Sequence, residues 1–322
     1  MLLLSILGIV AFSLVLIRAT DLLTDHLKEL AWKTRLGEFF LTSFLIGIAT
    51  SLPEISVGIT SALDGIPNIS LGNVIGSNVA NLSIITGIAT LIGGALVVKD
   101  QSYTSDFLYA LFAGIAPILL LADGSLTRVD GLILISLYGY YNFALLSKRD
   151  RTLDEDGGFF TSLLHRMKQN HVGRNFKYLF LALVLIIFSA DMIVKSGAYI
   201  AESLGVPIFL VGLFLVAIGT SLPELAFGFR ALKRNEPELF LGNLLGSTVV
   251  NATFIVGITV LIHPIVPVVV SEYIVATFMF IATVLLFIAF FRTKKKIAVW
   301  EGSFLIILYT IFVLLEVYLQ RV

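Results

Sequence analysis

Long apolar stretches alternate with short polar connections along almost the whole chain. A stretch of about 20 apolar residues is long enough to cross a lipid bilayer as a helix. The sequence contains ten such stretches, near residues 2–20, 38–62, 69–93, 105–122, 128–147, 176–198, 207–232, 239–262, 270–291 and 297–319. We therefore predict an all-α polytopic membrane protein with ten transmembrane helices.

Composition agrees with this pattern and narrows the possible functions. Of the 322 residues, 57% are hydrophobic and only 14% are charged, whereas soluble domains carry about a quarter charged residues. The 22 Lys and Arg residues balance the 22 Asp and Glu residues, so we expect the lipid bilayer and no nucleic acid as a partner. The absence of cysteine excludes disulfides, thiolate metal sites and cysteine nucleophiles.

The distribution of positive charge predicts the orientation in the membrane. Cytoplasmic loops carry an excess of Lys and Arg. Ten helices place both termini on one side, and 19 of the 22 Lys and Arg residues then fall on the other side. We expect both termini to be extracellular and the polar loop 148–175 to be cytoplasmic. The short loops and small size favour the plasma membrane of a prokaryote.

An internal repeat divides the chain into two halves. Residues 46–92 match residues 216–262 at a constant offset of 170, with 20 identities in 47 positions. The repeat unit holds five predicted helices, and an odd number inverts the second copy, as in many secondary transporters. We predict a first five-helix repeat at 1–147, a cytoplasmic linker at 148–175 and a second repeat at 176–322.

Each half carries one glutamate deep in an apolar stretch. Glu54 lies about 17 residues into the second stretch, and Glu224 lies equally deep in the seventh. A carboxylate near the bilayer centre costs at least about 2.5 kcal/mol, and no Lys or Arg lies at similar depth in the repeated segments. A bound cation is the simplest counter-charge. The alternative, a protonated structural carboxyl, is disfavoured by the duplication.

A proline precedes each glutamate. Pro53 and Pro223 lack an N–H group and clash with the carbonyl four residues earlier, so the helices should break there and expose backbone oxygens. A simple kink is the alternative. Oxygen donors recur in both copies around these breaks, namely Thr50, Ser51, Ser77, Asn81, Thr220, Ser221, Ser247 and Asn251. Such donors, without His or Cys, favour hard cations such as Na⁺ and Ca²⁺. For the two asparagines, interhelical hydrogen bonding is an equally good interpretation.

Two glycine pairs lie in the same repeated segments. Gly72 and Gly76, and likewise Gly242 and Gly246, have the G-x-x-x-G spacing. This spacing lets helix backbones approach closely in a membrane. We therefore expect close packing of the third and eighth helices.

The duplicated motifs closely resemble the two α-repeats of sodium/calcium exchangers, which belong to the calcium/cation antiporter superfamily. The likeness rests on residues 48–54 (IATSLPE) and 218–224 (IGTSLPE), each followed by a Gly-Asn-x-x-Gly-Ser segment that ends in Asn. It covers essentially the whole chain, whose length resembles that of minimal microbial members. Ala49 departs from the family pattern, which usually has Gly there.

The resemblance implies a specific ion site. In the family, the positions of Glu54 and Glu224 bind Ca²⁺, and those of Thr50 and Thr220 add backbone oxygens. Overlapping sodium sites use the positions of Gly47, Ser51, Ser77, Ala217, Ser221 and Ser247, with Asn81 and Asn251 in the middle. The first and sixth helices slide across a core formed by the second, third, seventh and eighth.

The implied protein is not an enzyme but an antiporter that exchanges Na⁺ for Ca²⁺ by alternating access. It would need no cofactor and would act as a monomer. Two carboxylates neutralise one Ca²⁺, and Na⁺ that shares their oxygens excludes it. A proton/calcium exchanger of the same fold is the main alternative, although that branch resembles Gly-Asn-x-x-Glu where this chain has Thr-Ser-x-Pro-Glu. A cation channel or a non-transporting scaffold would not require a duplicated core with buried glutamates. Some relatives carry Asp at the position of Asn251, and because Asn cannot ionise we expect no potassium requirement.

Overall fold

The computed structural model describes residues 2–34, 50–97, 103–147, 173–234, 236–266, 270–294 and 296–319, nearly all of them helical. In the first half the elements are α1 (Leu2–Thr34), α3 (Leu52–Leu63), α4 (Asn68–Ala80), η2 (Asn81–Ile85), α5 (Thr86–Gly93), β1 (Leu96–Val97), α6 (Tyr103–Leu120), η3 (Leu121–Asp123) and α7 (Arg128–Ser147). In the second half they are α9 (Gly173–Leu204), α10 (Ile208–Leu210), η5 (Val211–Val216), α11 (Ala217–Thr220), α12 (Leu222–Lys233), α13 (Pro237–Val249), η6 (Val250–Ile255), α14 (Val256–Ile262), α15 (Val270–Lys294), β2 (Lys296–Ile297) and α16 (Val299–Leu319).

The predicted apolar stretches coincide with these helices wherever the structure describes them. The stretch 38–62 begins outside the described residues, which resume at Thr50. The prediction for the first stretch was too short, since α1 continues from residue 20 to Thr34. Hydropathy located the apolar part of α1 but not its end, because the continuation carries charged residues.

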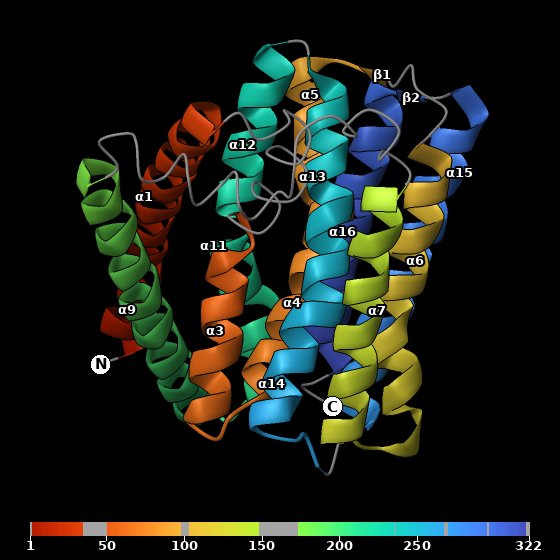
Figure 1. Ribbon diagram of the computed structural model, residues 1–322. Coiled ribbons are helices and arrows are strands. Elements are labelled where there is room, and N and C mark those ends of the chain that lie inside the picture. Colours follow the sequence, from red (N-terminus) through yellow and green to blue (C-terminus); the bar gives the residue numbers. More distant parts are fainter. Residues whose placement is uncertain are drawn as a thin grey trace.

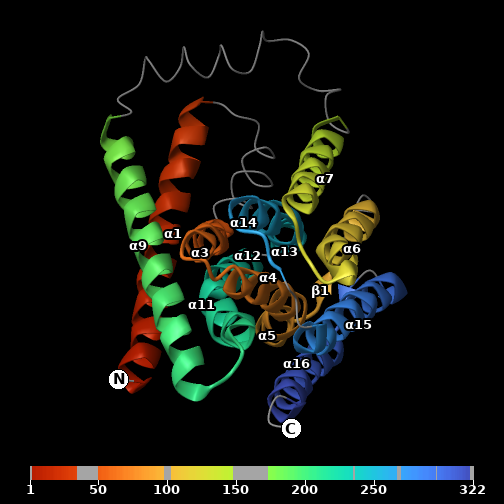
Figure 2. The ribbon, with the colours of Figure 1, turned by 90° about the horizontal axis from the view of Figure 1, so that it is seen from below.

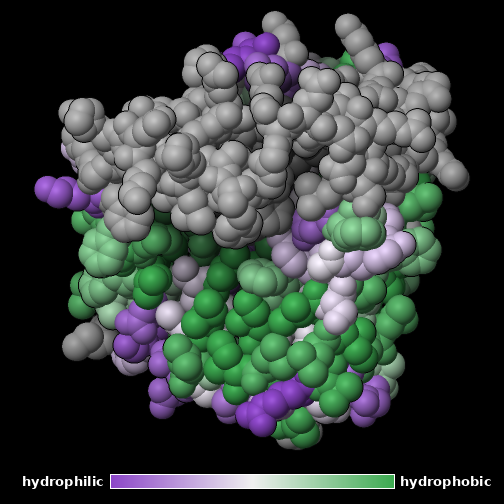
Figure 3. All heavy atoms as spheres, in the orientation of Figure 1, coloured by the Kyte–Doolittle hydropathy of each residue, from purple (hydrophilic) through white to green (hydrophobic). Residues whose placement is uncertain are grey.

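Seven helices or helical runs within the described parts of the chain are long and apolar enough to cross a membrane. They are Leu2–Leu23, Asn68–Gly93, Lys177–Leu204, Ile208–Lys233, Phe240–Ile262, Tyr273–Phe290 and Val299–Leu319. Large apolar side chains on the outer helices are exposed, including Phe112, Phe278 and Leu314. Where Figure 3 shows described side chains, most of the face is hydrophobic, with hydrophilic ones at its lower edge. Such a surface fits a lipid environment, so the chain is a membrane protein.

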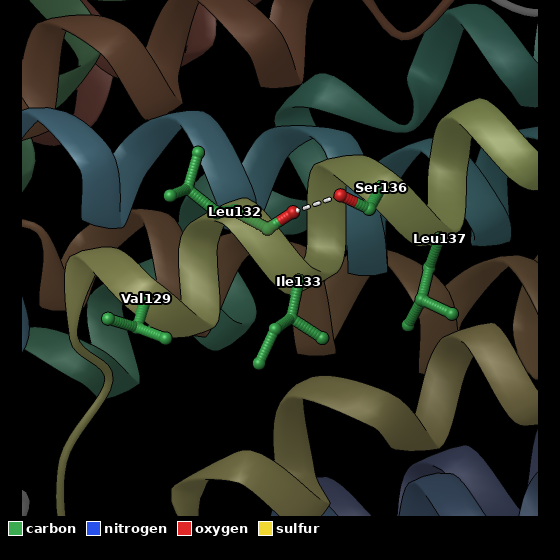
Figure 4. A pocket seen from close by; sticks show the side chains of 5 residues that line it. All are labelled: Val129, Leu132, Ile133, Ser136 and Leu137. Carbon is green, nitrogen blue, oxygen red and sulfur yellow. Dashed lines mark hydrogen bonds between the residues drawn. The ribbon is translucent and has the colours of Figure 1, made fainter.

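One depression in this apolar surface lies along α7. Val129, Leu132, Ile133, Ser136 and Leu137 line it (Figure 4). The hydroxyl of Ser136 donates a hydrogen bond of 2.7 Å to the carbonyl oxygen of Leu132 in its own helix. The depression therefore offers lipid an apolar surface and has no carboxylate in its lining.

The helices form a two-helix layer beside a larger group. α1 and α9 lie side by side along their length (Figures 1 and 2). Aromatic contacts join them, with ring centroids 5.8 Å apart for Phe12 and Phe188 and 4.8 Å apart for His26 and Tyr178. On their inner side lie α3, α4 and α11 to α14, while α6, α7, α15 and α16 cover the far side (Figure 2).

Contacts between the two halves recur at equivalent positions. Leu96 of β1 pairs with Ile297 of β2, and Leu126 forms an equivalent antiparallel bridge with Ile265. The equivalent helices of the two repeats lie at opposite ends of the molecule. α3 and α14 occupy the lower part of Figure 1, and α12 and α5 occupy the upper part. The two halves therefore share at least these contacts at equivalent positions.

Close helix contacts at glycine also occur at equivalent positions in the two halves. A Cβ atom at Gly87 of α5 would lie 2.5 Å from the carbonyl oxygen of Gly302 in α16, and one at Gly257 of α14 would lie 3.0 Å from that of Gly131 in α7. The first distance is too short for a Cβ atom, and in the second pair a Cβ atom at Gly131 would lie only 2.8 Å from the carbonyl oxygen of Gly257. Only glycine allows these two helix pairs to approach so closely.

The G-x-x-x-G pair of the third predicted helix packs against a different partner from the one expected. A Cβ atom at Gly72 or Gly76 of α4 would overlap the carbonyl oxygen of Phe209 or Leu213. The close neighbour of α4 is therefore the α10–η5 segment, within the seventh predicted helix. At Gly242 and Gly246, no atom of the described chain lies within 4 Å of a Cβ position.

The two ends of the chain lie at the same end of the molecule. In Figure 1 the start of α1 and the end of α16 are both at the bottom, while the end of α7 and the start of α9 are at the top. The predicted linker falls almost entirely on residues 148–172, which lie outside the described residues. Its cytoplasmic location stays a prediction.

Candidate cation site

The helix breaks predicted at the two prolines are confirmed. Ser221, with φ −83° and ψ 0°, separates α11 from α12, and Ser51, with φ −86° and ψ 2°, precedes α3. Both serines have ψ near 0°, away from the value of about −42° in a regular α-helix, and Pro53 and Pro223 each lack the N–H group that would continue the hydrogen-bond ladder. Each break places a glutamate in the first turn of a new helix.

The local sequence Ser-x-x-Glu permits a capping box, but neither copy forms one. In a capping box the serine hydroxyl and the glutamate carboxylate each bond to a backbone N–H of the other residue. Ser51 makes no side-chain cap bond, and its hydroxyl has no hydrogen-bond partner among the described residues. The hydroxyl of Ser221 likewise has no partner there. These groups are therefore not used by the helix ends and are available to a ligand.

The two glutamates are the most deeply buried charged groups of the site. Glu54 and Glu224 are both 0% exposed, and neither carboxylate accepts a hydrogen bond of normal geometry from the described residues. A buried charge without a partner costs several kcal/mol, so each carboxylate requires either a counter-charge or a proton.

The predicted neutral oxygen donors of both repeats are buried, as the two carboxylates are. The hydroxyl or amide groups of Ser51, Ser77, Asn81, Ser221, Ser247 and Asn251 are all at most 1% exposed. Both side-chain atoms of Asn81 and the Oδ1 atom of Asn251 lack a hydrogen-bond partner within the described chain. Among the residues that the structure describes, no three or more His, Cys, Asp or Glu side chains come together in a group that could hold a metal ion. Two carboxylates with neutral oxygens form a donor set suited to hard cations.

Hydrogen bonds between the halves hold the two motif segments together. Thr50 Oγ1 donates to Asn243 Oδ1 at 3.0 Å, and Thr220 Oγ1 donates to Asn73 Oδ1 at the same distance. Ser77 Oγ lies 3.4 Å from Thr220 Oγ1. The threonine hydroxyls thus fix the motifs to the opposite repeat.

Asn73 and Asn243 were not among the predicted site residues. The signal that could have found them is present in the sequence, since both are asparagines in apolar stretches and match at the offset of 170. The two residues belong to the site through the threonines that bind them, and their own exposure is 0% and 6%.

Each central asparagine lies in a π-helical segment. Asn81 begins η2, and Asn251 is the second residue of η6. The hydroxyl of Thr86, the first residue of α5, donates to the carbonyl oxygen of Asn81 in η2 at 2.7 Å, across five residues. Such wider turns occur often at functional sites, where they alter the direction of side chains.

The remaining predicted positions are only partly described. Gly47 lies outside the described residues. Ala217 is fully buried at the start of α11, and a Cβ atom at Gly76 would lie 2.7 Å from its Cβ atom. Ala217 therefore lies where α11 passes α4, one turn before the break at Ser221.

Together these features define a class of protein, namely a polytopic membrane protein with a duplicated, buried carboxylate site. The family model for sodium/calcium exchanger proteins matches residues 4–147 and 175–318. The chain belongs to the sodium/calcium exchanger family.

Two curated relatives illustrate the similarity. The sodium/calcium exchanger MaX1 of Methanosarcina acetivorans is 28% identical, with the match covering 94% of this chain and 96% of that protein. The putative antiporter CaxA of Alkalimonas amylolytica is also 28% identical, over 77% of this chain and 78% of its own.

Two solved structures resemble the fold. The sodium-calcium exchanger NCX_Mj has a TM-score of 0.65 and 25% identity, covering 97% of this chain and 99% of its own. The H⁺/Ca²⁺ exchanger CAX has a TM-score of 0.73 over 98% of this chain and 88% of its own, but only 17% identity. The second likeness therefore concerns the fold alone.

Proposed function

We propose that the protein is an antiporter that exchanges Na⁺ for Ca²⁺ across a membrane, with both ions as transported substrates and no resident cofactor. The observation that carries this proposal is the pair of fully buried carboxylates, Glu54 and Glu224, whose oxygens accept no hydrogen bond from the described chain. The match to the sodium/calcium exchanger family supports the same function.

In this proposal one Ca²⁺ lies between Glu54 and Glu224, and the backbone oxygens of Thr50 and Thr220 complete its ligands. Na⁺ occupies overlapping sites at the positions of Gly47, Ser51, Ser77, Ala217, Ser221 and Ser247, with Asn81 and Asn251 in the middle. Two carboxylates balance one divalent ion. Sodium ions that share the carboxylates repel Ca²⁺ and occupy its oxygens, so the two loads exclude each other.

We propose that ten helices in two inverted five-helix repeats, 1–147 and 176–322, build this transporter around the linker 148–175. Support comes from the equivalent contacts between the halves, such as Leu96 with Ile297 and Leu126 with Ile265. Alternating access would come from movement of the α1–α9 pair across the core. α1 and α9 contact each other more extensively than either contacts any other single element, which suits movement as a unit.

The cellular setting follows from the charge distribution. We propose a monomer in the plasma membrane with extracellular termini and a cytoplasmic linker, as the excess of Lys and Arg on one side indicates. An accessibility assay tests the orientation. Single cysteines placed at Ser125 and at residue 160 should react with an impermeant reagent from opposite sides of intact cells, because the native chain has no cysteine.

The coupling ion is the point on which the family and the fold neighbours differ. Proton coupling is the alternative, because the H⁺/Ca²⁺ exchanger CAX shares the fold. Unused serine hydroxyls beside both carboxylates favour Na⁺, which needs neutral oxygen ligands that a proton does not require. The test is uptake of radiolabelled Ca²⁺ into proteoliposomes driven by an outward gradient of Na⁺, K⁺ or H⁺ in turn. Uptake with the Na⁺ gradient alone is expected, and uptake with the H⁺ gradient alone would favour the alternative.

A further inference from the structure

Asn78 makes the two repeats unequal at their centre. It occupies the position equivalent to Thr248 and is 2% exposed on α4. Its Nδ2 atom donates to the carbonyl oxygen of Thr248 at 3.4 Å, and its Oδ1 atom accepts from Asn251 Nδ2 at 3.0 Å. The hydroxyl of Thr248 is used differently from the amide of Asn78, because it donates to Leu244 O at 2.9 Å in its own helix.

The chemistry of these groups fixes the direction of each amide. A backbone carbonyl only accepts hydrogen bonds, so Nδ2 of Asn78 must face Thr248. Oδ1 of Asn78 then faces Asn251, which must present its own Nδ2 atom. The Oδ1 atom of Asn251 is thereby turned away from Asn78, and it is buried without a hydrogen-bond partner in the described chain.

We infer that Asn78 is a positioning residue that orients Asn251 so that its oxygen, and not its NH₂ group, faces the ions. The inference rests on the proposed cation site. A cation binds the amide oxygen, whereas the NH₂ group carries partial positive charge and repels it. The orientation set by Asn78 therefore supplies one neutral ligand from the second repeat.

The equivalent asparagine of the first repeat lacks this restraint. Both side-chain atoms of Asn81 are buried and have no hydrogen-bond partner within the described segments. Its amide can turn either end toward the site, while the amide of Asn251 is held in one direction. The structure thus assigns a fixed oxygen ligand to one repeat and an adjustable one to the other.

The first test is Asn78→Leu, which keeps a similar volume and removes both hydrogen bonds. The apparent KM for Ca²⁺ should rise about tenfold, the effect of losing one well-oriented ligand, while the maximal exchange rate changes by less than about twofold. The stabilisation of the purified protein by Ca²⁺ in thermal unfolding should weaken in parallel. Asn142→Leu is the matched control, since that amide donates within its own helix to Tyr138 O, at 2.8 Å on α7. An unchanged KM in Asn78→Leu would overturn the inference.

A second background separates orientation from packing. In Asn251→Asp the side chain presents oxygen whichever way it turns, so adding Asn78→Leu should change KM by less than about twofold. A full tenfold rise there would show that Asn78 acts through packing, and would overturn the inference. Asn78→Ala replaces the leucine variant in both comparisons if the latter does not fold. If Ca²⁺ neither stabilises the unmodified protein nor is transported by it, the proposed function fails, and the inference with it.

Discussion

Thr50 donates a hydrogen bond of 3.0 Å to Asn243, a residue of the opposite repeat. The equivalent bond, from Thr220 to Asn73, has the same length. These two bonds tie each broken helix to the segment that carries the other half of the site. The backbone segments that carry the two glutamates are consequently tied to the opposite repeat by neutral groups.

Loss of one of these bonds should weaken both stability and ion binding. Thr50→Val keeps the shape of the side chain but leaves Asn243 Oδ1 buried without a donor, which costs about 1 to 3 kcal/mol. We expect a lower midpoint of thermal unfolding and a higher KM for Ca²⁺. The double variant Thr50→Val with Asn243→Leu should recover part of the stability. Additive losses in the double variant would show that the two side chains do not act as a pair.

Removal of either carboxylate charge should abolish calcium exchange. Glu54→Gln and Glu224→Gln each remove half of the charge that opposes Ca²⁺, and we expect exchange to fall by about 100-fold or more, as for loss of one partner of a buried ion pair. The protein should remain folded, because neither carboxylate accepts a hydrogen bond from the described residues. The measurement is Na⁺-driven Ca²⁺ uptake with unfolding temperature as the control. Uptake near the normal rate in either variant would contradict the site assignment.

The serines at the helix breaks should matter more for sodium than for calcium. Ser51→Ala and Ser221→Ala remove hydroxyls that make no protein hydrogen bond in the described chain. A neutral hydroxyl contributes a larger part of the binding free energy of a monovalent ion than of Ca²⁺, because Ca²⁺ is held mainly by the carboxylates. We expect Na⁺/Ca²⁺ exchange to fall while Ca²⁺/Ca²⁺ exchange changes little. Equal losses in the two assays would argue against separate ligand roles.

Position 251 should decide whether a further monovalent ion is needed. In Asn251→Asp three carboxylates would surround one Ca²⁺, and the extra charge would have to be protonated or paired. We expect the variant to gain a dependence on acid pH or on K⁺ that the unmodified protein lacks. Ca²⁺ uptake is measured against pH, with and without K⁺, for both proteins. Identical profiles would mean that residue 251 does not face the ions.

The close approach of α4 to the α10–η5 segment should be intolerant of a methyl group. In Gly76→Ala the new Cβ atom would overlap the carbonyl oxygen of Leu213, and overpacking of this kind costs about 1 to 3 kcal/mol. Gly139→Ala is the control, because no described atom lies within 4 Å of a Cβ atom there and alanine favours helix over glycine. Thermal unfolding should show a lower midpoint for the first and an equal or higher one for the second. Equal midpoints would show that α4 can move away from its neighbour without cost.

Features that depend on local chemistry follow from the order of the amino acids alone. Apolar stretches of sufficient length must form helices in a membrane, since every backbone polar group needs a partner there. The breaks before Glu54 and Glu224 follow in the same way from prolines that lack an N–H group. The offset of 170 showed which residues are equivalent, and so placed both glutamates in one predicted site.

Which polar groups of the described chain bond to each other depends on how the helices pack in three dimensions. The bonds of Thr50 with Asn243 and of Asn78 with Asn251 join residues 193 and 173 positions apart. Gly72 packs against the segment of Phe209, not against the eighth helix. Such pairings depend on which helix faces meet, and many faces carry suitable donors, acceptors or small residues. The direction of the Asn251 amide is therefore settled by a carbonyl of α13 and a side chain of α4, which no local pattern could have revealed.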